Sequence, residues 1–385
     1  MYYFDNAATT KPLPEIITIM NTVTQDYFAN PSSAHKLGVR SQKLLQQARQ
    51  QVADLLKYNS EEIIFTSSGT EANNWVFTSI VNAQHTLRPD RHVIWMSSIE
   101  HPCVRLQKER LERAGYKVEL IPVNSDGRID LTWFKENINR QVLLVSTILV
   151  NNEVGIIQPM EEISRLLEDY PEIIWHVDGV QGVTTQFHHL THSRIDLLSL
   201  SGHKFHSIRG TGLLAIRERV ARQPLLLGGG QELGLRSSTE TLAGIISFAK
   251  GLRLAFESQE ETKERLLNYR KQITKVLEQE GWTIFGHADY TSEHIICAAL
   301  PPVPGEVLIH AFEEYDIYIS TTSACSSRKH RNHSTLSAMN VPVAISNSAI
   351  RISLATTTTQ EEVTYLMKNI PKVTQSFKTL IHKGE

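Results

Sequence analysis

Lys204 lies at the end of an apolar segment, in the stretch LLSLSGHKFH over residues 197–206. A lysine in such a place is costly to bury unless its amine is paired, neutralised or used chemically. For this residue alone, a surface lysine just past a strand end is the simpler interpretation. Other polar groups follow apolar segments in the same way, and together they favour a chemical role for this lysine.

Three such groups are a helix start, an imidazole and a carboxylate. After EIIF a capping-box pattern begins at Ser68, where Gly69 and Thr70 add backbone amides and a hydroxyl that suit a phosphate. His101 follows VIWMSS, and Asp178 follows EIIWHV. Taken singly, the first is an ordinary helix start, His101 is an ordinary loop histidine and Asp178 is an ordinary helix cap. With a lysine amine they match the needs of pyridoxal phosphate: a Schiff-base amine, an anion for the ring nitrogen, a phosphate cradle and a ring-facing group.

The elements that must position these groups predict an α/β fold. Strand-like segments cover 62–67, 92–98, 117–123, 141–150, 172–178 and 196–202, and amphipathic helical segments such as 41–57 and 160–169 lie between them. This alternation is typical of a mostly parallel sheet, whose ligands bind where the strands end. After a helical stretch over about 240–280, further strands at 294–300, 315–321 and 349–355 predict a smaller α+β region. We expect a large domain over 15–255 and a small domain formed by 1–14 and 256–385.

Composition limits the classes of function. The 385 residues carry a net charge of −2, so no basic excess points to nucleic acid. The sequence predicts no secretion signal and no membrane-spanning stretch. Three separated cysteines without a C-x-x-C pair argue against a disulfide framework and favour a cytoplasmic protein.

Cys325 differs from the other two cysteines in its surroundings. It lies in a polar run over about 320–340, beside Arg328, Lys329 and Arg331, where we expect an exposed, mobile loop and a reactive thiolate. Cys297 lies in an apolar strand-like segment, and we interpret it, together with Cys103, as an inert buried side chain. The spacing C-x4-H-x2-H that starts at Cys325 lacks a fourth nearby ligand, so no metal site is predicted.

In order and spacing, these motifs closely resemble those of the cysteine desulfurases of the NifS/IscS type, in the class V branch of fold-type I pyridoxal-phosphate enzymes. The resemblance covers nearly the whole chain. Its motifs are YFDNAATT, NPSSAH, SSGTEANN, EHP, NNEVG, DGVQ, SGHKFH, GGGQELGLRSSTE, SACSS and IRISLA.

The resemblance implies a role for each matching residue. Lys204 would be the Schiff-base lysine, Asp178 the partner of the pyridinium, and His101 the imidazole that stacks on the ring and transfers protons. Further matches are Asn152 and Gln181 near the ring substituents, Thr70, Ser201 and His203 on the phosphate, Thr239 reaching the neighbouring active site of a homodimer, and Asn152 with Arg351 on the substrate carboxylate.

The implied reaction converts L-cysteine to L-alanine and leaves the sulfur as a persulfide on Cys325, from which a protein acceptor takes it. The acceptor could serve iron–sulfur cluster assembly, tRNA thiolation or thiamine synthesis, and altered loop residues favour a dedicated thiolation protein. Alternatives are a selenocysteine lyase, a class V aminotransferase or a non-catalytic sulfur-transfer scaffold. The departures from the family pattern are His206 to Gly210, Arg236-Ser237-Ser238-Thr239, and Thr321-Thr322, where glycines are missing and backbone freedom is reduced.

Overall fold

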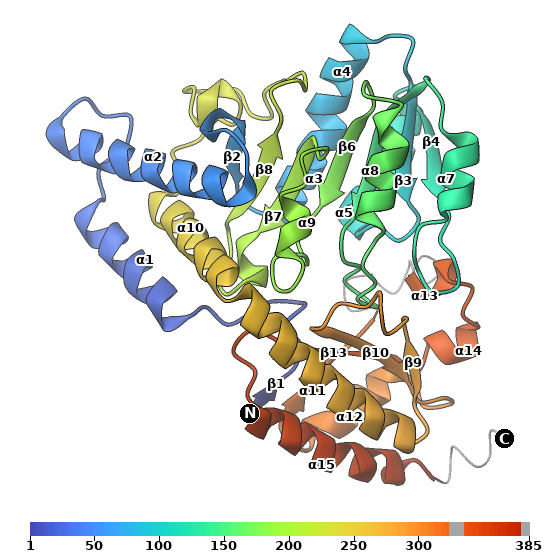
Figure 1. The fold of residues 1–385 in the computed structure, drawn as a ribbon. Coiled ribbons are helices and arrows are strands. Elements are labelled where there is room, and N and C mark those ends of the chain that lie inside the picture. Colours follow the sequence, from blue (N-terminus) through green and yellow to red (C-terminus); the bar gives the residue numbers. More distant parts are fainter. Residues whose placement is uncertain (323–334, 379–385) are drawn as a thin grey trace.

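A seven-stranded sheet forms the larger part of the computed structural model, which describes residues 1–322 and 335–378 (Figure 1). Its strand order is β2-β8-β7-β6-β5-β3-β4. The strands are β2 (Ile63–Thr66), β3 (Val93–Ser97), β4 (Lys117–Ile121), β5 (Val142–Ile148), β6 (Ile174–Asp178), β7 (Leu197–Ser201) and β8 (Gly212–Ile216). All neighbouring pairs are parallel except those that β8 makes with β2 and β7.

Helices cover both faces of this sheet, and most of its strands are accordingly rich in apolar residues. The edge strand β4 differs, because Lys117 is exposed and Glu119 is half-buried. In β2, Ile63 and Phe65 join the core on one face, whereas Ile64 joins the core on the other. One face lies under α2 (Lys36–Leu56), α7 (Leu131–Asn137), α8 (Met160–Glu168) and α10 (Leu242–Glu257). The opposite face lies under α3 (Gly69–Trp75), the π-helical turn Val76–Ile80, α4 (Val81–Leu87), α5 (Pro102–Arg105) and α6 (Gln107–Arg113).

A second, four-stranded sheet lies in the smaller part of the molecule. Its order is β12-β13-β10-β9, and every pair is antiparallel. The strands are β9 (Thr283–Phe285), β10 (Ile295–Ala299), β12 (Ser320–Thr321) and β13 (Ala349–Ser353). A pair of short strands, β1 (Tyr2–Tyr3) and β11 (Ile317–Tyr318), ties the first residues to this part.

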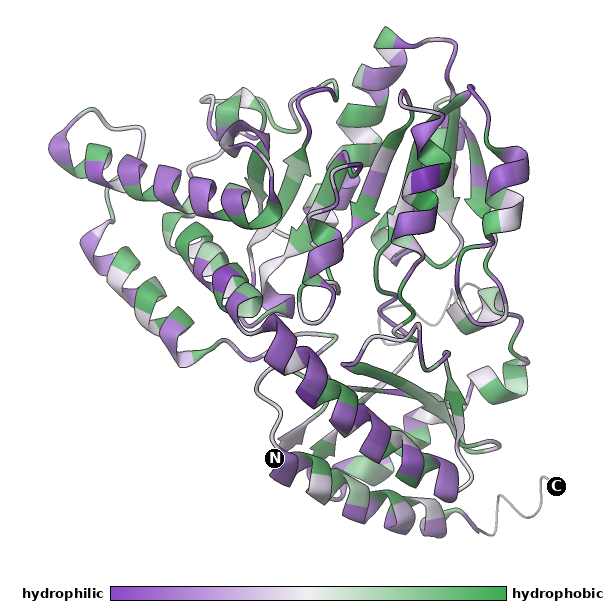
Figure 2. Cartoon of the chain, viewed as in Figure 1, coloured by the Kyte–Doolittle hydropathy of each residue, from purple (hydrophilic) through white to green (hydrophobic). Residues whose placement is uncertain are grey.

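The remaining helices complete the two parts. α1 (Pro14–Asp26) packs on α10, α9 (Phe187–Leu190) precedes β7, and α11 (Gln259–Gln279) packs along α15 (Gln360–Ser376). The short α12 (Gly305–Glu313) packs on β12 and β13, and α13 (Thr335–Ala338) contacts α14 (Val343–Ser346). Leu336 of α13 joins a core that includes strands of the large sheet. Figure 2 shows hydrophobic residues along the strands of the large sheet and hydrophilic residues along much of α2 and α11. No helix within the described residues has both the length and the apolar character needed to span a membrane.

The predicted strands and the α/β class are confirmed, with the following differences. The segment 315–321 forms two short strands with different partners, since β11 pairs with β1 and β12 pairs with β13. β1, β8 and β9 were not predicted. The predicted boundaries at 15 and 255 fall outside both sheets, and the division into domains at those residues stays a prediction.

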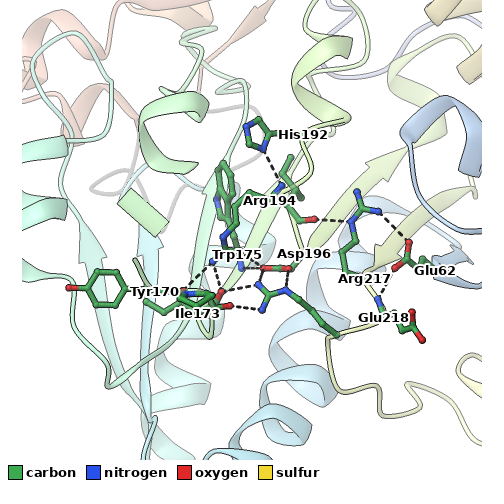
Figure 3. A network of polar contacts seen from close by, with 12 residues as sticks. Glu62, Tyr170, Ile173, Trp175, His192, Arg194, Asp196, Arg217 and Glu218 are labelled. Atoms are coloured by element: carbon green, nitrogen blue, oxygen red, sulfur yellow. Dashed lines mark hydrogen bonds and ion pairs between the residues drawn. The ribbon is translucent and has the colours of Figure 1, made fainter. Parts of the chain in front are cut away.

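The edge of the large sheet where β7 begins is held by a buried carboxylate (Figure 3). Asp196, 2% exposed, accepts hydrogen bonds from the guanidinium groups of Arg194 and Arg219 and from the backbone N–H of Trp175. This network joins the starts of β6 and β7. It lies at the opposite ends of the strands from the polar groups predicted to do chemistry.

Candidate active site

The predicted chemical groups meet at the carboxyl ends of the parallel strands. β2, β3, β5, β6 and β7 all run in one direction, since β8 is antiparallel to both of its neighbours. The loops after these strands enclose a cavity of about 260 Å3. The predicted site residues that line it are Gly69, Thr70, His101, Asn152, Asp178, Gln181, Ser201, His203, Lys204 and Arg351.

Lys204 ends a turn of 3-10 helix, Gly202–Lys204, that directly follows β7. Its Nζ donates hydrogen bonds to the carbonyl oxygens of Ala7 and Ala8, at 2.6 and 2.7 Å. Gln181 also donates to the carbonyl of Ala7, at 2.9 Å. The amine of this lysine therefore lies at the cavity and is partnered there by the N-terminal segment.

Asp178 is the last residue of β6 and is buried. Its carboxylate accepts hydrogen bonds from Asn73 Nδ2 at 2.8 Å and from the backbone N–H of Val180 at 3.1 Å. Burial raises the pKa of Asp178, and the nearby His101, the two hydrogen bonds and Lys204 oppose that rise. A cationic ring nitrogen placed beside this carboxylate would favour its ionised form further.

His101 lies between β3 and α5, where its Nδ1 caps the helix by accepting the backbone N–H of Cys103 at 3.3 Å. Burial lowers the pKa of His101, and Lys204 and Arg105 lower it further, whereas Asp178 raises it. The imidazole is therefore held neutral at neutral pH. A neutral imidazole can lie against an aromatic ring and exchange protons there.

The opposite end of the cavity suits a phosphate. Ser68 caps α3 by accepting the backbone N–H of Glu71, so the first turn of the helix points its free amides into the cavity. A Cβ on Gly69 would come within 2.8 Å of Val180 Cγ2, so only glycine leaves this turn unobstructed. Ser201 Oγ is buried and makes no hydrogen bond within the described residues.

His203 lies at the same end of the cavity, next to Lys204 in the chain. Its pKa is lowered to about 4 by burial and by the charges of Lys204 and Arg209. The neutral ring can donate one hydrogen bond. A carboxylate, an amine, an unpaired hydroxyl and a helix start around one cavity fit pyridoxal phosphate, as the residues predicted.

Arg351, on β13, closes the cavity from the small sheet. Its side chain is 2% exposed and forms a 2.8 Å ion pair with Asp5 Oδ1. It also donates to the carbonyl oxygen of Asn152 at 2.7 Å. Asp5 and Asn152 thus hold the guanidinium in place beside the residues that line the cavity.

Among the described residues, one predicted site residue, Thr239, does not join this group. Thr239 lines a separate cavity of about 230 Å3, together with Gly210, Glu232 and Arg236. Cys325 falls within 323–334, outside the described residues. The prediction of a mobile loop over about 320–340 is wrong at both ends of that run, where Ser320–Thr321 forms β12 and Thr335–Ala338 forms α13.

Sequence reasoning missed the roles of Asn73, Cys103 and Asp5. Asn73 contacts Asp178, and Cys103 Sγ lies 2.9 Å from His101 Nδ1. Cys103 lines the cavity, so it is not simply a core residue, although burial raises its pKa to about 12 and keeps it a poor nucleophile. A weak signal existed, since Asn73 and Asp5 lie within the motifs SSGTEANN and YFDNAATT, and Cys103 directly follows EHP.

Comparison with known proteins agrees with this geometry. A family model described as aminotransferase class V matches residues 2–366. A NifS/IcsS protein homolog from Lactobacillus delbrueckii subsp. bulgaricus is 43% identical over the full length of both chains. A protein named cysteine desulfurase IscS from Dictyoglomus turgidum is 32% identical over 98% of this chain and 95% of its own length.

Solved structures give the same result. A NifS-like protein superposes with a TM-score of 0.91 and 34% identity, over 97% of this chain and 99% of its own. A structure described as SspA in complex with cysteine has a TM-score of 0.77 and 27% identity, over 92% of this chain and 99% of its own. The chain therefore belongs to the class V aminotransferase family and, within it, to the cysteine desulfurases of the NifS/IscS type.

Proposed function

We propose that this protein is a pyridoxal-phosphate-dependent cysteine desulfurase that converts L-cysteine to L-alanine and holds the sulfur on Cys325. The observation that carries the proposal is the cavity itself. Lys204, His101 and Asp178 surround it, a helix start suited to phosphate forms one end, and Arg351 closes it. Its relatives are named cysteine desulfurases, and one solved neighbour is described with cysteine bound.

Each end of the cavity has a distinct task in this proposal. Gly69, Thr70, Ser201 and His203 would hold the phosphate, and Asp178 would pair with the ring nitrogen. When bound, pyridoxal phosphate supplies a carbonyl carbon that accepts an amine and a ring that withdraws electrons. Asn152 and Gln181 would contact the ring substituents.

The substrate carboxylate binds Arg351, whose guanidinium offers paired N–H groups to an oxygen pair. Lys204 Nζ then removes the proton from the substrate Cα, and His101 carries protons at the same face. The neutral state of His101 suits this task, because a group with a pKa near or below the working pH can accept a proton.

Sulfur transfer is a reaction between two sulfur atoms. The Cys325 thiolate attacks the substrate sulfur, an S–S bond forms, and the C–S bond breaks with its electron pair left on the substrate carbon. That carbon takes up a proton and leaves as alanine, so the products are alanine and a Cys325 persulfide. No external oxidant or reductant is needed.

The persulfide passes to a protein acceptor in the cytoplasm. We prefer an acceptor in tRNA or cofactor thiolation over an iron–sulfur scaffold, because of the altered residues at 206–210 and 236–239. We further propose a homodimer in which Thr239 contacts the neighbouring phosphate. The place of Thr239 outside the cofactor cavity of its own chain supports this arrangement.

Alanine formation from L-cysteine tests the proposal. Parent protein loaded with pyridoxal phosphate is compared with Cys325→Ala, in the presence of a thiol that regenerates the enzyme. Cys297→Ala is the matched control, because Cys297 is fully buried on β10 and burial raises its pKa, so that it stays a thiol.

We expect alanine from the parent and from Cys297→Ala, and little from Cys325→Ala. Equal alanine from all three proteins would overturn the role of Cys325. No alanine from any of them, with a keto acid consumed instead, would favour an aminotransferase. Pull-down of cluster-assembly scaffold proteins alone would contradict the preferred thiolation pathway.

A further inference from the structure

Asn73 and Cys103 form a hydrogen-bonded link between Asp178 and His101. Asn73 Nδ2 donates to Asp178 Oδ2 at 2.8 Å and to Cys103 Sγ at 3.2 Å. Cys103 Sγ in turn lies 2.9 Å from His101 Nδ1. In the proposed function Asp178 would contact the ring nitrogen of the cofactor and His101 would contact the ring surface. These two side chains are therefore joined through one residue of α3 and one residue of α5.

The backbone of Cys103 fixes the direction of this chain. Its N–H lies 3.3 Å from His101 Nδ1, and an N–H can only donate. Nδ1 must therefore present its lone pair, so the thiol also acts as a donor to it, while the sulfur accepts from Asn73. In the neutral ring the proton is then on Nε2.

The charge state of the thiol agrees with this direction. Burial raises the pKa of Cys103 to about 12, and the negative charge of Asp178 adds to that rise. The sulfur therefore keeps its proton at neutral pH and is available as a donor. Cys103 serves in this chain as a hydrogen-bonding group and not as a nucleophile.

The charged groups around His101 also favour its neutral form. Lys204 beyond β7 and Arg105 on α5 lower the pKa of His101, as burial does, and Asp178 on β6 opposes them. Glu100, adjacent in the chain, is fully buried, and burial raises its pKa well above the ordinary value. This rise favours the neutral form of Glu100.

We propose that Asn73 and Cys103 are positioning residues, which hold His101 in the tautomer with its proton on Nε2 and orient Asp178 through the same chain of hydrogen bonds. The inference rests on the proposed function, because it takes His101 and Asp178 to face the cofactor. It extends that function by assigning roles to two residues outside the predicted site.

The tautomer can be measured directly, without turnover. Long-range 1H–15N correlation spectra of full-length, cofactor-loaded protein with 15N-labelled histidine distinguish a protonated Nδ1 from a protonated Nε2. Loss of one set of signals in His101→Gln assigns the resonance. We expect the parent to show an unprotonated Nδ1 and a protonated Nε2 above the pKa of His101.

Variants then test the link itself. Cys103→Ala removes one of two donors to Nδ1, so the neutral ring is less stabilised and the pKa of His101 should rise by roughly half to one unit. Cys103→Ser keeps a donor and should restore the parent value. Asn73→Ala should weaken cofactor binding on the order of ten-fold, because Asp178 loses a partner; Asn74→Ala, one position along α3, should not.

The outcomes separate this proposal from the proposed function. A protonated Nδ1 in the parent, an unchanged His101 pKa in Cys103→Ala, or a Cys103→Ser protein that behaves like Cys103→Ala would each overturn the positioning role. Those results could be obtained even if the protein formed alanine as proposed. Conversely, the predicted tautomer in a protein that forms no alanine would contradict only the proposed function. Thermal unfolding of each variant checks that it is folded.

Discussion

The side chains of Asp5 and Arg351 are 346 residues apart in the sequence and form a 2.8 Å ion pair. This pair aligns the one arginine among the described residues that line the cofactor cavity. The substitution Asp5→Asn should keep the shape of the side chain but remove its charge, so that Arg351 is less well oriented for a substrate carboxylate. We expect KM for L-cysteine to rise on the order of ten-fold with a much smaller change in kcat.

Steady-state kinetics at several cysteine concentrations measure this split. Asp54→Asn, which changes an exposed carboxylate on α2, is the matched control and should leave both constants unchanged. A fall in kcat at unchanged KM would show that Asp5 acts in the chemical step instead of in substrate binding.

Gly69→Ala tests the phosphate end of the cavity. The added Cβ would lie 2.8 Å from Val180 Cγ2 and 3.3 Å from Ser201 Cβ, so the helix start must shift. Such crowding costs about 1–3 kcal/mol, and we expect cofactor affinity to fall at least ten-fold. Titration of cofactor-free protein with pyridoxal phosphate, followed by absorbance, measures the affinity. Unaltered affinity would place the phosphate elsewhere.

Asp196→Ala should destabilise the fold without a direct effect on the site. The substitution leaves Arg194 and Arg219 without their buried partner, and loss of one member of a buried ion pair typically costs about 3–5 kcal/mol. Because Arg219 is 42% exposed, we expect the lower end of that range. Urea unfolding measures the loss, and Asp54→Ala, at an exposed position, should stay within about 0.5 kcal/mol of the parent.

Buried histidines predict a loss of stability in acid. The pKa of His176 and that of His294 are each lowered to about 3 by burial. Below pH 6.5 the unfolded chain takes up protons that the folded chain does not, so stability falls as pH falls from 6.5 towards 3. At pH 5 each residue contributes a loss of about 2 kcal/mol relative to neutral pH.

Urea unfolding at pH 7 and pH 5 measures this dependence. His176→Gln should reduce the difference between the two pH values, whereas His310→Gln, at an exposed position, should not. An equal pH dependence in all three proteins would show that His176 is protonated in the folded state.

Much of the fold could be predicted because the central strands are buried on both faces, which produces continuous apolar runs such as 141–150. Polar residues at the end of such a run, or a few positions after it, were then expected at the edge of the sheet where ligands bind. This reasoning located His101, Asp178 and Lys204. β8 was missed because GLLAI at 212–216 is short and directly follows the polar loop after Lys204.

Asn73, Cys103 and Asp5 could not be predicted in the same way. Their roles depend on which side chains meet across the fold, since Asn73 and Asp178 are 105 residues apart in the chain. No local pattern encodes such a meeting. The split of 315–321 has the same origin, because its two halves are separated by their different strand partners, β1 and β13.

The link between the first and last parts of the chain has a consequence for biosynthesis. Asn6 donates to the carbonyl of Ser353, and the backbone N–H of Ala7 donates to Ser353 Oγ, so the segment that partners Lys204 is fixed by residues made some 350 positions later. Domains fold as they leave the ribosome, and the strands of the large sheet emerge well before Ser353. A nascent chain can therefore form the strand ends that line the cavity early, but the segment at Ala7 and Ala8 is fixed in place only after Ser353 has been synthesised.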